Sequence, residues 1–228
     1  MALGADAASY TDSGLPPDTQ YFYRVYAYNS GGNSPYSNTA DATTLETPPA
    51  GLNLVPFALV GSGIVMASDL EAAIVAANPG TVVTQIFSWD GSNQKYTFPY
   101  LNLGGGLTIG DFELQVGASY FVEAAGPVSL DLIGTDYSSC SLYNGLNVFA
   151  VPPGRASDAG IVTASDLAAE IVSSTGLTVT QIFGWDSSNQ KFTFPYLNLG
   201  GGVIIGDFIL DEGTGYFIEV NGDGVYQP

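Results

Sequence analysis

The chain has 228 residues and a net charge of −18, which comes from 22 acidic and only 4 basic residues. So few lysines and arginines cannot form the positive patch that binds phosphate, and nucleic acid and anionic membrane surfaces are therefore excluded as partners. Hydrophobic residues make up 46% of the chain, and 29 glycines with 13 prolines predict frequent turns. This composition favours a secreted protein that is rich in short β-strands.

The first predicted element is a β-hairpin. Along residues 21–28, aromatic and aliphatic side chains alternate between the two faces of an expected strand. The glycine-rich residues 31–33 predict its turn, and residues 37–44 predict the returning strand.

Residues 1–46 resemble the C-terminal half of a fibronectin type III domain. The resemblance rests on Leu15, Pro17, Thr19, Tyr21, Tyr23, Arg24, Val25, Ala27, Asn29, Gly32 and Ser34. It implies that Tyr21 is the corner tyrosine, whose hydroxyl bonds back to the preceding loop. The earlier strands of that domain have no counterpart upstream, so we expect the chain to be a fragment of a longer parent chain that continues before Met1. Completion of the half sandwich by another subunit is the alternative.

The rest of the chain contains an internal repeat. Residues 84–114 recur as residues 180–210, and only six of these 31 paired positions differ. A fixed period of this kind indicates one module built twice. We place the first copy at residues 51–134 and the second at 145–228, with a polar connector at 135–144.

Each copy predicts one helix, at residues 67–77 in the first. Ser68 is its expected N-cap, and Glu71 would complete a capping box. The second copy keeps the cap as Ser165 but has Ala168 in place of the acid. The apolar stripe that should face a sheet consists of Leu70, Ile74 and Val75, and of Leu167, Ile171 and Val172.

An aromatic hairpin follows each helix. Residues 81–90 predict a strand that turns at 91–94 and returns along 95–103. A loop of this length predicts three cross-strand pairs, which are Asp90 with Lys95, Trp89 with Tyr96, and Phe87 with Phe98. The Asp–Lys pair recurs at Asp186 and Lys191, and we interpret it as an exposed contact that sets the register.

Further strands are expected on both sides of this hairpin. Each copy opens on a predicted strand, at residues 51–59 or 145–151. The glycines at 104–106 predict a tight bend and not a phosphate loop, because no lysine and no long helix follow them. Strands are then expected at 107–116 and 119–123.

The end of each copy carries the pattern L-x-x-G-x-x-Y-F-V/I, which begins at Leu114 and Leu210. Together with the W-D-x-x-x-Q hairpin and the S-D-L helix start, it resembles a module found at the C-terminal ends of bacterial secreted and surface proteins. Such modules often follow fibronectin type III domains. The resemblance implies an extracellular location and neither an activity nor a cofactor.

Little in the sequence favours catalysis. Histidine is absent and Cys140 is the single cysteine, which excludes Ser-His-Asp and Cys-His sites and an internal disulfide. We expect no metal site; Asp111, Asp207 and Asp223 are weak calcium candidates, because they lie in turn-like segments without the spacing of a dedicated loop.

Sugar binding is the other chemistry considered. Flat aromatic rings could stack on pyranose rings, and the candidates are Tyr100, Tyr196, Trp89 and Trp185. Because each tyrosine follows a proline, we expect both to be partly exposed. The tryptophans are expected in the cores of small domains that have little area to bury.

We therefore predict a mainly β chain of α+β repeats, with a partial fibronectin type III sandwich followed by two antiparallel modules. The expected function is a non-catalytic structural, spacer or adhesion region of a larger secreted or cell-surface protein. A tandem carbohydrate-binding module that gains avidity on a polysaccharide is one alternative. A self-assembling surface-layer or filament component is the other. The partner would be a polysaccharide or another surface protein, without membrane insertion.

Overall fold

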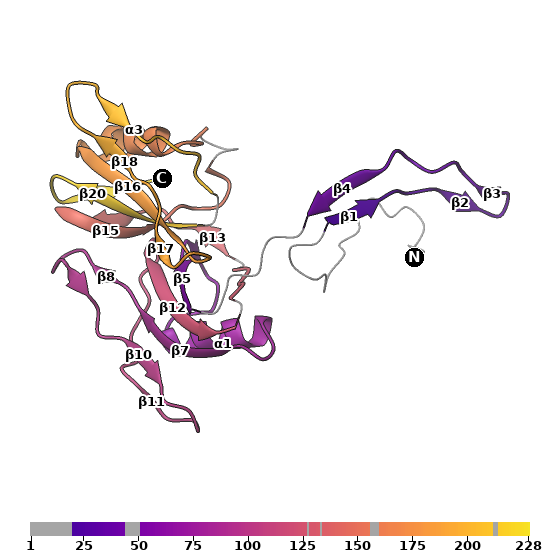
Figure 1. Cartoon of the computed structure of the whole chain (residues 1–228), viewed down its shortest axis with the longest axis horizontal. Helices are drawn as coiled ribbons and strands as arrows, with labels where there is room; N and C mark the ends of the chain where they lie inside the picture. The colour runs from indigo at the N-terminus through magenta and orange to yellow at the C-terminus, as the bar shows by residue number, and fades with distance from the viewer. Residues whose placement is uncertain (1–19, 44–50, 127, 133, 156–159, 212–213) are drawn as a thin grey trace. The chain divides into compact units, whose positions relative to one another are not determined.

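The computed structural model describes residues 20–43, 51–126, 128–132, 134–155, 160–211 and 214–228. These residues are mainly β, in several antiparallel sheets, with two helices named α1 and α3 (Figure 1). The chain divides into two compact units, Met1–Thr47 and Pro48–Pro228, so both copies of the repeat belong to the second unit.

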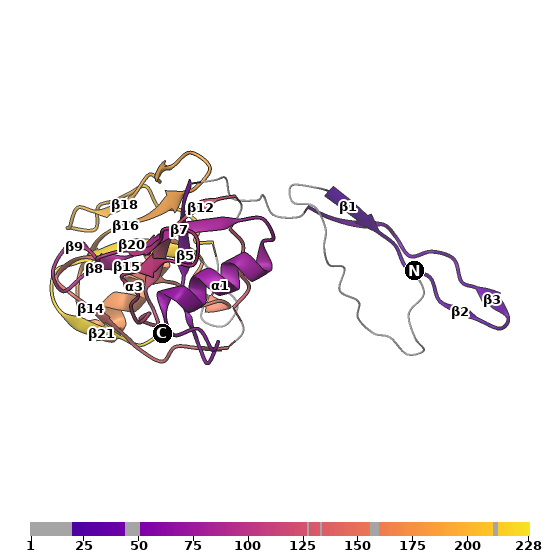
Figure 2. The ribbon, with the colours of Figure 1, turned by 90° about the horizontal axis from the view of Figure 1, so that it is seen from below.

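The described part of the first unit is a long β-hairpin (Figure 2). Strand β1 (Gln20–Tyr23) pairs with β4 (Ala40–Thr43), and β2 (Tyr28–Asn29) pairs with β3 (Gly32–Asn33). The turn lies between β2 and β3, slightly earlier than predicted. The loop that precedes Tyr21, where its expected hydrogen-bond acceptor would be, lies outside the described residues.

The second unit contains two main sheets with the same order of strands. The first sheet runs β11-β10-β7-β12-β5, and the second runs β19-β18-β16-β20-β15, with all neighbours antiparallel. The first is built from β5 (Gly51–Pro56), β7 (Val82–Phe87), β10 (Tyr100–Asn102), β11 (Thr108–Ile109) and β12 (Ser119–Ala125). The second is built from β15 (Gly145–Ala150), β16 (Val179–Asp186), β18 (Tyr196–Asn198), β19 (Ile204–Ile205) and β20 (Gly215–Val220).

One helix covers the outer face of each sheet, α1 (Ala67–Ala77) on the first and α3 (Ala164–Thr175) on the second (Figure 1). Both were predicted from the apolar stripe, and Leu70, Ile74, Leu167 and Ile171 are buried. The stripe is narrower than predicted, because Val75 and Val172 are 38% and 44% exposed. The order of layers is therefore helix, sheet, sheet, helix, and the central β12 and β20 are buried on both faces.

The helix starts differ from the prediction. The N-cap is Met66 in α1 and Thr163 in α3, and Ser68 and Ser165 lie inside the first turn. The Asp69 carboxylate accepts hydrogen bonds from the backbone N–H groups of Val65 and Met66 at 3.0 and 2.9 Å. Because Asp69 already binds these N–H groups, the predicted capping box of Ser68 and Glu71 is wrong.

The hairpin register is partly as predicted. Trp89 and Asp90 of β8 (Trp89–Asp90) face Tyr96 and Lys95 of β9 (Lys95–Tyr96), and β16 pairs in the same way with β17 (Lys191–Phe192). The Phe87–Phe98 pair is wrong, because Tyr100 faces Ile86 and the register has shifted by one residue. The shift occurs around Pro99, which has no backbone N–H to donate to the ladder. Phe98 is left 70% exposed.

The remaining predictions concern the bend and the strand after it. Gly104, Gly105 and Gly106 have φ of +80°, +62° and +82°, so the predicted tight bend is confirmed. The strand predicted at 107–116 is wrong in length: it is regular only over β11, because Gly110 has a φ of +75° that interrupts an extended backbone. The strand predicted at 119–123 is present as β12.

The polar connector is not a loose link. Its strand β13 (Thr135–Asp136) pairs with β6 (Leu59–Val60) of the first copy. Its strand β14 (Cys140–Leu142) pairs with the C-terminal β21 (Gly224–Tyr226) of the second copy. The connector therefore hydrogen-bonds to both copies.

Candidate functional site

The two copies share a small core where the inner faces of their sheets meet. It is formed by Phe121, Val148 and Phe217, with partly buried Leu52, Leu54, Phe87, Trp89, Leu146, Phe183 and Trp185 around it. The pattern Tyr-Phe-Val explains the contribution of β12: Tyr120 and Val122 join the core under the helix, and Phe121 points to the opposite face. Its ring lies edge-on to Trp185, at 5.4 Å between ring centroids.

Both tryptophans bond across this interface. The Trp89 indole Nε1 donates to the carbonyl oxygen of Leu146 in the second copy, at 2.7 Å. The Trp185 Nε1 donates to the carbonyl oxygen of Leu52 in the first copy, at 2.8 Å. The expectation of tryptophans within a core holds only in part, because each is half-buried and lies between the copies rather than inside its own.

The glutamine of each W-D-x-x-x-Q hairpin bonds to the same backbone. The Gln94 Nε2 donates to the Leu146 carbonyl oxygen at 3.0 Å, and its Oε1 accepts from the Leu146 N–H at 2.9 Å. Gln190 makes the same pair of bonds with Leu52, also at 3.0 and 2.9 Å. We call the four side chains Trp89, Gln94, Trp185 and Gln190 the reciprocal clasp, because each copy holds the first strand of the other.

Glycine allows this close approach. Gly51 and Gly145 immediately precede the clasped leucines and have φ of +137° and +98°. A Cβ atom at Gly51 would lie 2.7 Å from the Gln190 Oε1, and one at Gly145 would lie 2.5 Å from the Gln94 Oε1. A side chain at either position would therefore be strained and would displace the clasp.

The hairpin aspartates bind their own turns. Asp90 accepts hydrogen bonds from the Ser92 hydroxyl and the Asn93 backbone at 2.6 and 3.1 Å, and these bonds lower its pKa. Asp186 is bound by Asn189, and its pKa is lowered for the same reason. Neither aspartate forms an ion pair with its lysine within the part of the chain that the structure describes.

The three weak calcium candidates also have structural partners. Asp111 accepts from the Ser68 N–H and hydroxyl at 3.0 and 2.7 Å, and Asp207 binds Ser165 in the same way. Asp223 accepts from the Asn144 N–H at 2.8 Å. No group of three or more acidic, cysteine or histidine side chains suited to a metal ion occurs among the described residues.

The two tyrosines proposed as sugar platforms are buried. Tyr100 and Tyr196 are 1% and 2% exposed, so the prediction of partial exposure is wrong. The register shift after Pro99 directs the Tyr100 ring toward α1, where its hydroxyl donates to Glu71. Burial raises the pKa of both phenols, and the Glu71 carboxylate adds to this effect at Tyr100. Neither ring can offer a face to a sugar in this fold.

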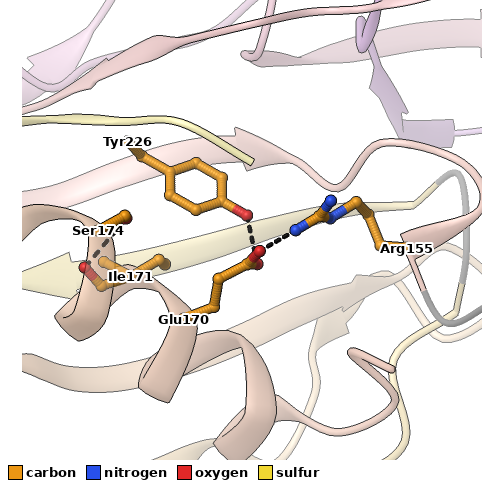
Figure 3. A network of polar contacts seen from close by, with 5 residues as sticks. All are labelled: Arg155, Glu170, Ile171, Ser174 and Tyr226. Carbon is orange, nitrogen blue, oxygen red and sulfur yellow. Dashed lines mark hydrogen bonds and ion pairs between the residues drawn. The ribbon is translucent and has the colours of Figure 1, made fainter. Parts of the chain in front are cut away.

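A polar cluster under α3 was not predicted. The Tyr226 hydroxyl donates to Glu170 at 2.6 Å, and Arg155 forms an ion pair with the same carboxylate (Figure 3). Cys140 packs nearby, and burial raises the pKa of its thiol to about 12. The thiol is therefore neutral at ordinary pH, which lowers its reactivity as a nucleophile. The residues of this cluster are far apart in the sequence, and no local motif marks them.

Each tryptophan lines a separate concavity at the edge of the interface. Trp185 lines a groove of 530 Å³ together with Phe87, Tyr96, Phe121 and Phe192. Trp89 lines a smaller cleft of 350 Å³, which includes residues of the connector. The sequence signal that locates both concavities is the W-D-x-x-x-Q hairpin.

Comparisons with family models, curated proteins and solved structures give no match, so the function has to be argued from the residues and their geometry. Within the described ranges, neither helix is both long and apolar enough to cross a membrane.

Proposed function

We propose that this chain is a non-catalytic structural region of a larger secreted or cell-surface protein. In this proposal, residues 48–228 act as one rigid spacer. The observation that carries the proposal is the reciprocal clasp. Two modules that were only linked in series would each keep their polar hairpin ends in water. Here each hairpin end holds the backbone of the other copy, and the interface also contains a shared aromatic core.

The use of the acidic side chains supports a structural function. A catalytic carboxylate needs an oxygen that is free to reach a substrate. Acidic side chains of both copies instead bind turns, helix starts and strands, as seen at Asp90, Asp111, Glu123, Asp186, Asp207, Glu219 and Asp223. No histidine is present to act as a base.

The proposed extracellular location has separate support. The acidic composition and the resemblance of residues 1–46 to half a fibronectin type III domain both favour a surface protein. A tagged full-length chain in its native host should be cleaved by protease added to intact cells. Protection of the tag until the cells are lysed would contradict an extracellular location.

The spacer function is tested by pulling on the ends of the chain with a single-molecule force probe. Residues 48–228 should unfold in one event, because neither copy keeps its clasped strand when the other opens. Two events of about half the length each would contradict the proposal. The double variant Gln94→Ala with Gln190→Ala should lower the unfolding force. Gln115→Ala is the control, because this exposed glutamine has a side chain that bonds to no other described residue.

Self-assembly remains a second proposal, and one observation favours it. The hairpin of the first unit leaves large apolar side chains exposed, with Phe22 at 66% and Val25 at 71%. A two-stranded hairpin with exposed aromatic residues is an edge to which other strands can add. The full chain should then sediment as an oligomer, and the double variant Phe22→Ser with Val25→Ser should be monomeric. A monomeric full chain would rule this proposal out.

A further inference from the structure

The cleft beside Trp89 is built from three segments that are distant in the sequence. Trp89 and Ser92 come from the hairpin of the first copy, Gln115 from the turn before β12, and Ser141 and Tyr143 from the connector. The connector sequence occurs once in the chain, and residues 47–50 before the first copy do not resemble it. The connector residues of the cleft therefore have no counterpart in a second copy, whereas each copy supplies one half of the clasp.

The floor of the cleft is apolar and its rim is polar but uncharged. The floor includes Val148 and Phe149, which are 8% and 1% exposed. At the rim, the side chains of Gln115, Ser141 and Tyr143 make no hydrogen bond to any other described residue, although all three are exposed. Three free hydrogen-bonding groups thus surround an aromatic and aliphatic floor.

Charge narrows the class of ligand. The cleft is lined by one carboxylate, Asp90, which already accepts bonds from Ser92 and Asn93. No basic side chain of the described residues lines the cleft, and the net charge of −18 repels anions. A single carboxylate occupied in this way is a poor ligand set for a metal ion. A neutral ligand with several hydroxyl groups fits the free amide and hydroxyls at the rim.

Size and ring chemistry point to the same class. A volume of 350 Å³ lies at the lower end of small-molecule sites, which span about 300 to 1,000 Å³. An indole and a phenol beside neutral hydrogen-bonding groups suit the apolar face and the hydroxyl edge of a sugar ring. We infer that the Trp89 cleft binds one or two rings of a neutral saccharide. This goes beyond the spacer function, and it replaces two equal sites with a single site per chain.

The test follows the two indole N–H signals of the ¹⁵N-labelled full chain by NMR. Trp89→Phe and Trp185→Phe variants assign the two signals. The probes are cellotetraose, chitotetraose and xylotetraose as neutral saccharides, with glucuronic acid as the anion and choline as the cation. At least one neutral saccharide should shift the Trp89 signal in a saturable way and leave the Trp185 signal in place.

Substitutions at the rim test whether its side chains bind the saccharide. Gln115→Ala and Tyr143→Ala should each weaken that saccharide about fivefold, the effect of one lost hydrogen bond. Asp211→Ala, at the position equivalent to Gln115 in the second copy, should leave the affinity unchanged, and the spectra of all variants should show an intact fold. The inference is overturned by no saturable shift with the neutral saccharides, by a stronger shift with choline or glucuronic acid, or by rim variants that bind like the parent chain.

Discussion

The interface side and the helix side of the two copies follow different rules. On the interface side, Trp89 and Gln94 are matched by Trp185 and Gln190. Their acceptors are the equivalent carbonyl oxygens of Leu146 and Leu52, at nearly the same distances. On the helix side, Glu71 of the first copy binds Tyr100, but the equivalent position in the second copy is Ala168. The second copy instead uses Glu170, whose counterpart in the first is Ala73.

The difference shows where the repeat is constrained. A side chain of the clasp must reach the backbone of the other copy, and the clasp positions hold the same residue type in both copies. A side chain under the helix has to satisfy only its own core, and polar groups there can be paired in more than one way. The first copy binds a tyrosine of β10, and the second binds Arg155 and Tyr226, from outside its central strands.

Removing a tryptophan should cause the largest loss. Trp89→Ala or Trp185→Ala deletes a large ring from the shared core and one hydrogen bond between the copies. Each should destabilise residues 48–228 by about 3 to 5 kcal/mol, and the two losses should be similar. Urea unfolding followed by circular dichroism measures this. A variant that unfolds in two steps, with one copy untouched, would show that the copies fold separately.

Substituting either clasp glutamine should cause a smaller loss of stability, and the two losses should again be equal. Gln94→Ala removes both bonds to Leu146 and leaves its backbone N–H without this partner, which should cost about 1 to 2 kcal/mol. Gln190→Ala should cost the same through Leu52. Gln115→Ala should be within about 0.5 kcal/mol of the parent, as for ordinary surface substitutions. Unequal losses of stability at the two clasp positions would contradict the equivalence of the two copies at their interface.

Substituting the two buried tyrosines should change the stability by different amounts, in contrast to the equal losses expected at the clasp. Tyr100→Phe loses a hydrogen bond to a carboxylate and should cost about 1.5 to 3 kcal/mol. The second copy has Ala168 at the position of Glu71, and the Tyr196 hydroxyl bonds to no other described residue. Tyr196→Phe should therefore change the stability by less than about 0.5 kcal/mol. Thermal unfolding of the two variants decides this, and equal shifts would contradict the assigned partners.

At neutral pH the smallest effect is expected from the ionisation of Cys140. Because burial raises its folded-state pKa from 9.0 to about 12, the neutral thiol stabilises the fold fully below pH 9.0. This contribution should be lost as the pH rises from 9.0 toward 12. Below pH 9.0 a thiol reagent should modify the denatured chain much faster than the native chain. In Cys140→Ala the unfolding free energy should fall less steeply above pH 9.0, and an unchanged slope would contradict the burial.

Several elements could be predicted because their signals are local. The helix at Ala67–Ala77 follows from its apolar spacing, and the pairs Trp89–Tyr96 and Asp90–Lys95 follow from the loop length. The capping prediction failed because Ser68 and Asp69 are adjacent and both suit a helix start. Only the position of Asp111 shows that Ser68 has a different partner.

The candidate site was less accessible to prediction. Both tryptophans were singled out, but a repeated residue looks the same whether it fills its own core or binds the other copy. Tyr100 and Tyr196 were placed on the wrong side because one residue of register at a proline reverses the face of a strand. The fibronectin type III resemblance, the location and the sugar hypothesis stay predictions.

The amino-acid sequence alone determined the repeat period and the mainly β class, since periodicity and turn residues are properties of composition and spacing. Tertiary structure decided how the copies combine. The indole of Trp89 reaches a carbonyl 57 positions away, and that of Trp185 reaches one 133 positions away. Hydrogen bonds over such separations depend on how two sheets pack, and no local pattern encodes that packing.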